Sequence, residues 1–109
     1  MHHAVCPAPY RSGFRGSPEE IARRSAEDIR EIIRYSTPGK LAAFIAEPIQ
    51  GIGGATHEAP NYLYEAYRNT REHGGLCIAD EVQTRFGRAG DHYGGLQHSG
   101  LVPDLVTMD

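Results

Sequence analysis

Two short apolar runs, each followed by acidic residues, constrain the fold of this sequence more than any other feature. The runs are residues 41–46, followed by Glu47, and residues 76–79, followed by Asp80 and Glu81. Continuous apolar stretches of this length are typical of strands that are buried on both faces of a parallel sheet. Acidic side chains next to buried strands are costly without partners, so they indicate a site at the strand ends.

Helical patterns occupy the sequence before and between these runs. The segment 17–20, Ser-Pro-Glu-Glu, predicts a capped helix start, and apolar residues at helical spacing continue to about residue 35. A second helix is predicted between Pro60 and Gly74. Strand, helix and strand in succession predict a right-handed βαβ unit with parallel strands, and residues 101–107 predict a third strand. The fold class is therefore α/β.

Composition excludes several classes of function. The chain has 109 residues and a formal net charge of −3, so it holds at most one small domain, without the basic stripe that nucleic acid requires. Its two cysteines and six histidines lack the spacing of a zinc site, so we expect no metal. No apolar run is long enough to span a membrane, and the first residues lack the pattern of a signal peptide. We therefore expect a cytoplasmic protein, or a mitochondrial one if the source is eukaryotic.

The residues alone leave two nucleotide-binding interpretations to weigh. Residues 76–81 resemble the magnesium-binding strand of nucleotide hydrolases, although the phosphate-binding loop of such enzymes is missing. Gly51, Gly53 and Gly54 suggest a dinucleotide loop, but the third glycine of that fingerprint is absent and no helix follows directly. We interpret the glycine run as a tight turn and keep the nucleotide-hydrolase fragment as an alternative.

Three motifs in order carry a resemblance to a known family. They are Glu-Pro-Ile-Gln-Gly-x-Gly-Gly at 47–54, Ile-Ala-Asp-Glu-Val-Gln-Thr-x-Phe-Gly-Arg-x-Gly at 78–90, and Pro-Asp-Leu-Val-Thr-Met at 103–108. Together they resemble the class III (ω-type) aminotransferases, most closely the alanine–glyoxylate aminotransferase 2 branch. The resemblance implies that residues 1–109 are a fragment, incomplete at both ends, of the large pyridoxal-phosphate-binding domain of an aspartate-aminotransferase-like (fold type I) enzyme.

The same resemblance implies roles for individual residues. Asp80 would be the catalytic carboxylate that holds the ring nitrogen of pyridoxal phosphate, and Val82 would lie against the ring. Gln83 would donate a hydrogen bond to the phenolic oxygen, and Glu47 would line the same pocket. The implied reaction transfers an amino group from an alanine-type donor to a 2-oxo acid such as glyoxylate or pyruvate, in a homodimer. Glu81 is expected to be structural and to pair with an arginine such as Arg88.

Two departures from the family pattern carry expectations of their own. The family continues after Val-Thr-Met with Ala-Lys, and that lysine binds the cofactor covalently, whereas here Asp109 follows Met108. Lys40 is expected at the opposite end of its strand, so the chain as written is expected not to transaminate. It would then be a piece of a working enzyme or a non-catalytic remnant that binds a relative. Arg85 stands where the family has glycine, which predicts backbone strain if φ is positive there.

Overall fold

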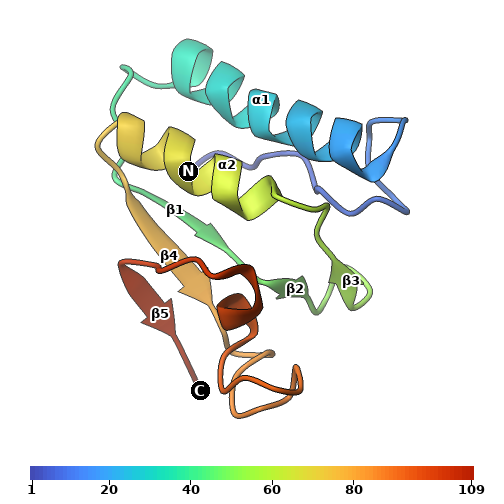
Figure 1. Ribbon diagram of the computed structural model, residues 1–109. Coiled ribbons are helices and arrows are strands. Elements are labelled where there is room, and N and C mark those ends of the chain that lie inside the picture. Colours follow the sequence, from blue (N-terminus) through green and yellow to red (C-terminus); the bar gives the residue numbers. More distant parts are fainter.

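The computed structural model describes residues 1–109 as two helices packed on one side of a small parallel sheet (Figure 1). The elements in chain order are α1 (Pro18–Ser36), β1 (Ala43–Ala46), β2 (Ile49–Gln50), β3 (Thr56–His57), α2 (Tyr62–Glu72), β4 (Leu76–Asp80), the 3₁₀ helix η1 (Gly95–Ser99) and β5 (Leu105–Thr107).

The sheet has the strand order β1-β4-β5, and both pairings are parallel. Ala46 pairs with Ala79 at the end of β1, and Asp80 pairs with Thr107 at the end of β5. The predicted βαβ unit is confirmed, and so is the third strand, which is shorter than the run 101–107. The arrowheads of the three strands point the same way in Figure 1. Their carboxyl ends therefore lie side by side at one end of the sheet, the carboxyl edge.

Helix α1 begins where the sequence predicts. The Ser17 side chain accepts a hydrogen bond from the Glu20 backbone N–H, and the Glu20 carboxylate accepts one from the Ser17 N–H. This capping box satisfies two of the free N–H groups at the helix start. Ile21, Ile29 and Ile33 form part of the buried face of α1, which packs on α2.

Helix α2 lies between α1 and the sheet, in the middle of the core. The predicted inward residues are all buried: Leu63, Ala66, Tyr67 and Thr70. The helix begins at Tyr62, two residues later than Pro60, because Asn61 adopts a left-handed conformation with φ of 64°. The ring of Tyr67 meets Phe44 of β1 edge-on, with 6.4 Å between ring centroids.

The sheet is covered on one face only, which corrects the prediction of strands buried on both faces. In β4, Cys77 and Ala79 face the helices and are fully buried. On the other face, Ile45 is 52% exposed, Leu76 48% and Leu105 53%. The prediction is wrong for these residues because α2 packs on the other face of the sheet and α1 lies beyond α2 (Figure 1).

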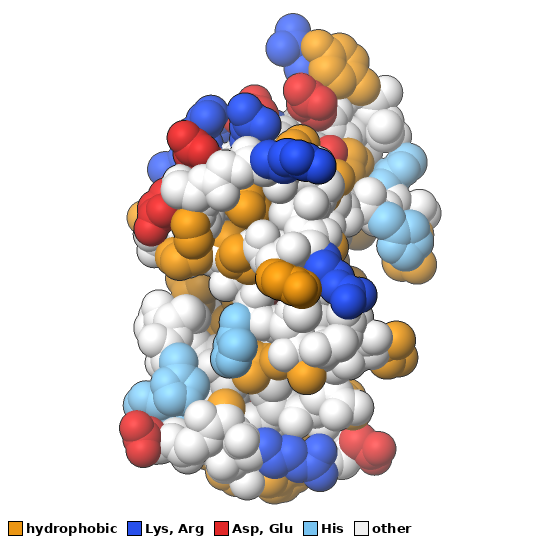
Figure 2. Space-filling view, turned by 90° about the vertical axis from the view of Figure 1, so that its right-hand side faces the viewer, with side chains coloured by type: hydrophobic (Ala, Val, Ile, Leu, Met, Phe, Trp, Pro, Cys, Tyr) orange, Lys and Arg blue, Asp and Glu red, His pale blue; other side chains and the backbone are white.

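The outer face of α1 carries charges of both signs. Arginine and acidic side chains alternate along it, and Figure 2 shows them intermingled in the upper part of the molecule, level with α1. Surface ion pairs such as Arg30–Glu27 at 3.5 Å belong to this face. No helix here combines the length and the apolar character needed to cross a membrane.

Candidate active site at the carboxyl edge of the sheet

The strand register brings together the side chains that follow β1 and β4. Ala46 pairs with Ala79, so Glu47 and Asp80 come next in line on neighbouring strands. Both are half-buried. Ligands of open parallel sheets bind outside the carboxyl ends of the strands. The predicted site residues therefore lie at the edge where such a sheet binds its ligand.

Asp80 has one carboxylate oxygen held by the protein and one without a protein partner. Its Oδ1 accepts hydrogen bonds from the Val82 backbone N–H at 3.2 Å and from the Thr107 hydroxyl at 3.0 Å. No donor among residues 1–109 bonds Oδ2. A half-buried carboxylate in this state can accept a further strong, charge-assisted hydrogen bond.

Gly51 lies close to both Glu47 and Gln83. The Glu47 Oε2 atom accepts a hydrogen bond from the Gly51 N–H at 2.9 Å. A Cβ added at Gly51 would come within 3.0 Å of the Gln83 Cγ and 3.5 Å of the Glu47 Oε2. Glycine at this position therefore lets the Gln83 side chain lie close to Glu47.

The side chain of Val82 is 38% exposed, directly after Asp80 and Glu81. Its backbone N–H is bonded to Asp80, so the turn that begins there is fixed to the strand end. A flat ring that binds Asp80 would find an apolar side chain next to it. The structure thus places all four predicted site residues at one edge: Glu47, Asp80, Val82 and Gln83.

Glu81 faces away from this edge and stabilises the following loop. It is 3% exposed, and its oxygens accept hydrogen bonds from the Thr84 hydroxyl at 2.6 Å, the Gly95 N–H at 2.8 Å and the Leu96 N–H at 2.9 Å. The last two are free N–H groups at the start of η1. The structural role is as predicted, but the expected pairing with Arg88 is wrong. Glu81 is also unavailable as a magnesium ligand beside Asp80.

An open cavity of about 820 Å³ extends along the β1 edge of the sheet. It is bordered by Val5, Ile45, Glu47, Glu58, Tyr62 and Asp80. Burial, together with the charge of Glu47, raises the pKa of Glu58 from 4.5 to about 8. A carboxyl group beside the predicted cofactor residues is therefore mostly protonated at neutral pH. No sequence motif marks Glu58, because its surroundings depend on the fold, which brings it near Glu47.

The glycine run 51–54 forms the turn of a hairpin. Strands β2 and β3 pair in an antiparallel manner, with Ile49 opposite His57 and Gln50 opposite Thr56. The interpretation as a tight turn is confirmed, and no helix N-terminus follows it for a pyrophosphate to bind. No group of three or more His, Cys, Asp or Glu side chains could hold a metal ion.

The condition for backbone strain at Arg85, a positive φ, is not met in the loop after Glu81. Positive φ occurs at Phe86 (62°) and Gly87 (73°) and not at Arg85. The Arg85 guanidinium lies 5.0 Å from the centroid of the Tyr93 ring, and Phe86 meets the same ring edge-on. Arginine at this position is therefore part of an aromatic cluster and does not strain the backbone.

Lys40 lies at the opposite end of the sheet from Asp80. It comes before β1, whereas Asp80 is level with the residue after the β1 carboxyl end. Seven residues of extended chain separate the two levels, roughly 20 Å. The predicted position of Lys40 is confirmed, and its side chain cannot replace a lysine at the site.

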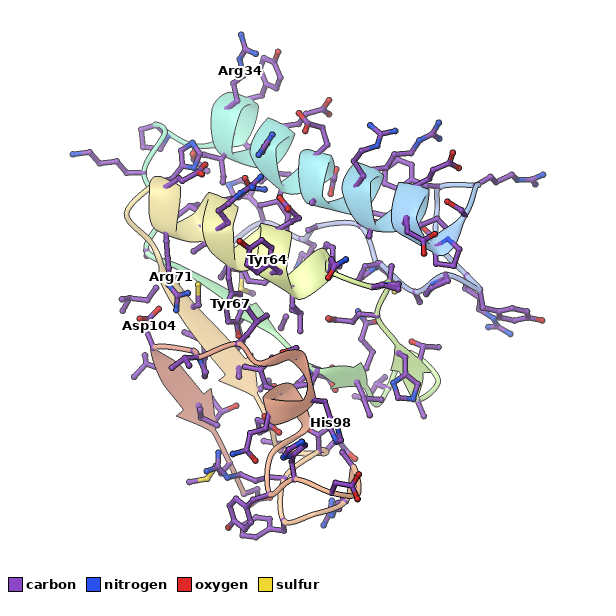
Figure 3. The ribbon with its side chains drawn as sticks, viewed as in Figure 1. Arg34, Tyr64, Tyr67, Arg71, His98 and Asp104 are labelled. Atoms are coloured by element: carbon purple, nitrogen blue, oxygen red, sulfur yellow. The ribbon has the colours of Figure 1, made fainter.

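The amino end of β5 is fixed by a second acidic residue, Asp104. Its Oδ2 accepts hydrogen bonds from the Cys77 N–H at 2.7 Å and from Arg71 at 3.4 Å, and its own N–H donates to the Cys77 carbonyl at 2.8 Å. Figure 3 shows Arg71 of α2 and Asp104 pointing toward one another. The Asp104 carboxylate has a lowered pKa, chiefly because of the Cys77 N–H. This cluster sets the register of β5 and thereby the place of Thr107.

Comparison with known proteins identifies the family. The sequence profile of the class-III aminotransferases matches residues 1–109. The chain belongs to this family. The family resemblance drawn from the three motifs is therefore confirmed, and the parallel sheet and its carboxyl edge are those of a class-III aminotransferase.

Curated relatives of this aminotransferase segment are much longer proteins. The mitochondrial alanine–glyoxylate aminotransferase 2 homolog 2 of Arabidopsis thaliana is 46% identical over 108 residues, which cover 99% of this chain and 22% of that protein. The human mitochondrial alanine–glyoxylate aminotransferase 2 is 37% identical over 122 residues, covering 95% of this chain and 24% of that protein. The chain thus spans about a quarter of the length of these relatives.

Solved transaminase structures have the same fold as this segment. The ω-transaminase of Pseudomonas jessenii in complex with PMP matches with a TM-score of 0.87 and 36% identity, covering 95% of this chain and 23% of that one. The ω-transferase of Vibrio fluvialis JS17 matches with a TM-score of 0.89 and 30% identity, covering 98% and 26%. These neighbours are fold type I transaminases, so the predicted fold class is confirmed.

Proposed function

We propose that residues 1–109 supply one wall of the cofactor pocket of a pyridoxal-phosphate-dependent aminotransferase. In this proposal Asp80 is the catalytic carboxylate, and Glu47, Val82 and Gln83 contribute to the cofactor site. The observation that carries it is Asp80 itself: a half-buried carboxylate at the carboxyl edge of the sheet, with Oδ1 held by two donors and Oδ2 without a protein partner.

The surroundings of Asp80 fit pyridoxal phosphate. Oδ2 suits a protonated ring nitrogen, and the exposed Val82 side chain offers an apolar surface to the ring. Gln83, whose side chain lies against Gly51, offers an amide donor for a ring oxygen. The donor set therefore agrees with the cofactor of the family.

When bound, pyridoxal phosphate supplies an electron sink for the carbanion that forms at the substrate carbon. Asp80 would keep a proton on the ring nitrogen, because a carboxylate that accepts a hydrogen bond favours the charged form of the donor. Its place at the end of a strand fixes the direction of that bond. Glu47, through its bond to Gly51, would keep the hairpin close to Gln83.

For the complete enzyme we propose transfer of an amino group from an alanine-type donor to a 2-oxo acid such as glyoxylate or pyruvate. The names of the relatives in Arabidopsis and human support this substrate class and allow a mitochondrial location, while the cytoplasmic location stays a prediction. We further propose a homodimer, as the family resemblance implies.

The proposal is tested by Asp80→Ala in a full-length protein that carries this segment. The cofactor should still bind, although more weakly, while removal of the proton from the substrate carbon should slow by about two to four orders of magnitude, because a buried charged pair is lost. Single-turnover kinetics with alanine measure this step. Glu72→Ala, at an exposed position on α2, is the control and should leave the rate unchanged.

Two results would contradict the assignment of Asp80. One is a near-normal rate in Asp80→Ala. The other is a larger loss per folded molecule in Glu81→Ala than in Asp80→Ala. Either would mean that the wrong carboxylate has been assigned.

A further inference from the structure

The orientation of the Asp80 carboxylate needs a physical cause. The terminal torsion of an aspartate side chain is broad, so a carboxylate without restraints rotates through a wide range. Here two donors on the same oxygen come from different segments. The Val82 N–H belongs to the turn after β4, and the Thr107 hydroxyl belongs to β5. Together they fix which oxygen faces the protein.

The strand that carries Thr107, β5, is fixed by hydrogen bonds at both of its ends. The Thr107 carbonyl accepts a hydrogen bond from the Glu81 N–H at 3.1 Å, in register with the pairing of Thr107 with Asp80. At the other end, Asp104 binds the backbone of Cys77. The hydroxyl is therefore delivered to Asp80 by a strand whose register has two anchors, and it does not depend on a flexible loop.

From this geometry we infer that Thr107 is a positioning residue for cofactor binding: its hydroxyl holds Oδ1 of Asp80, so that Oδ2 is the oxygen presented to the cofactor ring nitrogen. The inference rests on the proposed role of Asp80. Thr107 touches neither cofactor nor substrate in this account and acts only through the carboxylate. Threonine and serine supply the required O–H donor, and valine has a similar shape without it.

The test compares Thr107→Val with Thr107→Ser in a full-length protein that carries this segment. In Thr107→Val only the Val82 N–H still binds Oδ1. We expect about ten-fold weaker binding of pyridoxamine phosphate and a similar loss in kcat, because a hydrogen bond to a charged group is lost. With the ring nitrogen labelled with ¹⁵N, its chemical shift should move toward the unprotonated value. Thr107→Ser should restore most of the affinity and the shift.

Thr37→Val provides a matched control, because it removes a threonine hydroxyl that binds the backbone at the end of α1. It should lower the thermal midpoint without moving the ¹⁵N shift. If Thr107→Val leaves affinity and shift unchanged while Asp80→Ala moves both, the inference about Thr107 is wrong and the proposed function stands. If Asp80→Ala changes neither the affinity nor the shift, the proposed role of Asp80 is wrong, and the inference about Thr107 is wrong with it. Equal effects of the valine and serine substitutions would also overturn the inference.

Discussion

Replacing Glu81 with alanine should destabilise the protein through the loop that follows β4. The carboxylate is 3% exposed and accepts three hydrogen bonds, two of them from the backbone N–H groups of Gly95 and Leu96. Alanine leaves the buried Leu96 N–H and the partly buried Gly95 N–H without an acceptor, at about 1–3 kcal/mol each. The cavity left by the side chain adds to this, so we expect a loss of about 3–5 kcal/mol in the free energy of unfolding.

Urea unfolding of the cofactor-free, full-length protein measures this loss. Hydrogen exchange at Gly95 and Leu96 locates it, because these amides lose their acceptor. Glu81→Gln keeps one acceptor oxygen, which can bind only one of the two N–H groups, so it should lose about half as much free energy of unfolding. Glu72→Ala removes an exposed ion pair with Arg68 and should cost less than about 1 kcal/mol. A loss in Glu81→Ala no larger than in Glu72→Ala would refute the reasoning.

Two further predictions concern Glu58 and the open face of the sheet. Because the pKa of Glu58 in the folded protein is about 8, above its ordinary 4.5, stability should fall as the pH rises from 5 to 9, by at most about 5 kcal/mol. Glu58→Gln should flatten this fall in pH-dependent unfolding, and Glu31→Gln should not. The 109-residue chain alone should self-associate in sedimentation through Ile45 and Leu105. Ile45→Lys should weaken this and Tyr35→Lys should not, while a monomeric wild type would contradict it.

Local signals in the sequence predicted the elements and the edge where the site lies. The Ser-Pro-Glu-Glu segment 17–20 specifies a helix start through contacts between neighbours in sequence, and the structure contains these contacts. Asp80 and Glu47 follow apolar runs, and parallel pairing is sufficient to bring the ends of such runs together. Predictions of this kind succeed because they need only the chain near each residue and the direction of the strands.

The features that the sequence did not predict depend on contacts between distant segments. Thr107 meets Asp80 only because β5 pairs with β4 in one register, and nothing near Thr107 in sequence specifies that register. Glu81 binds Gly95 and Leu96, which are 14 and 15 residues away, so an arginine looked the better partner. The apolar runs 41–46 and 76–79 do not specify how many layers cover the sheet, which is why the prediction of burial on both faces was wrong.

The opposite surroundings of Asp80 and Glu81 have a consequence for changes in chain length. Side chains alternate between the two faces of a strand, so a shift of one residue would reverse the faces to which these two neighbours point. One deletion in residues 76–79 would move Asp80 to the buried face that Cys77 and Ala79 occupy, and it would turn Glu81 toward the pocket. The turns 84–94 lie outside the strands and carry no such alternation. Insertions and deletions should therefore be tolerated in these turns and not in β4. This should hold even at positions of β4 where a single substitution has only a small effect.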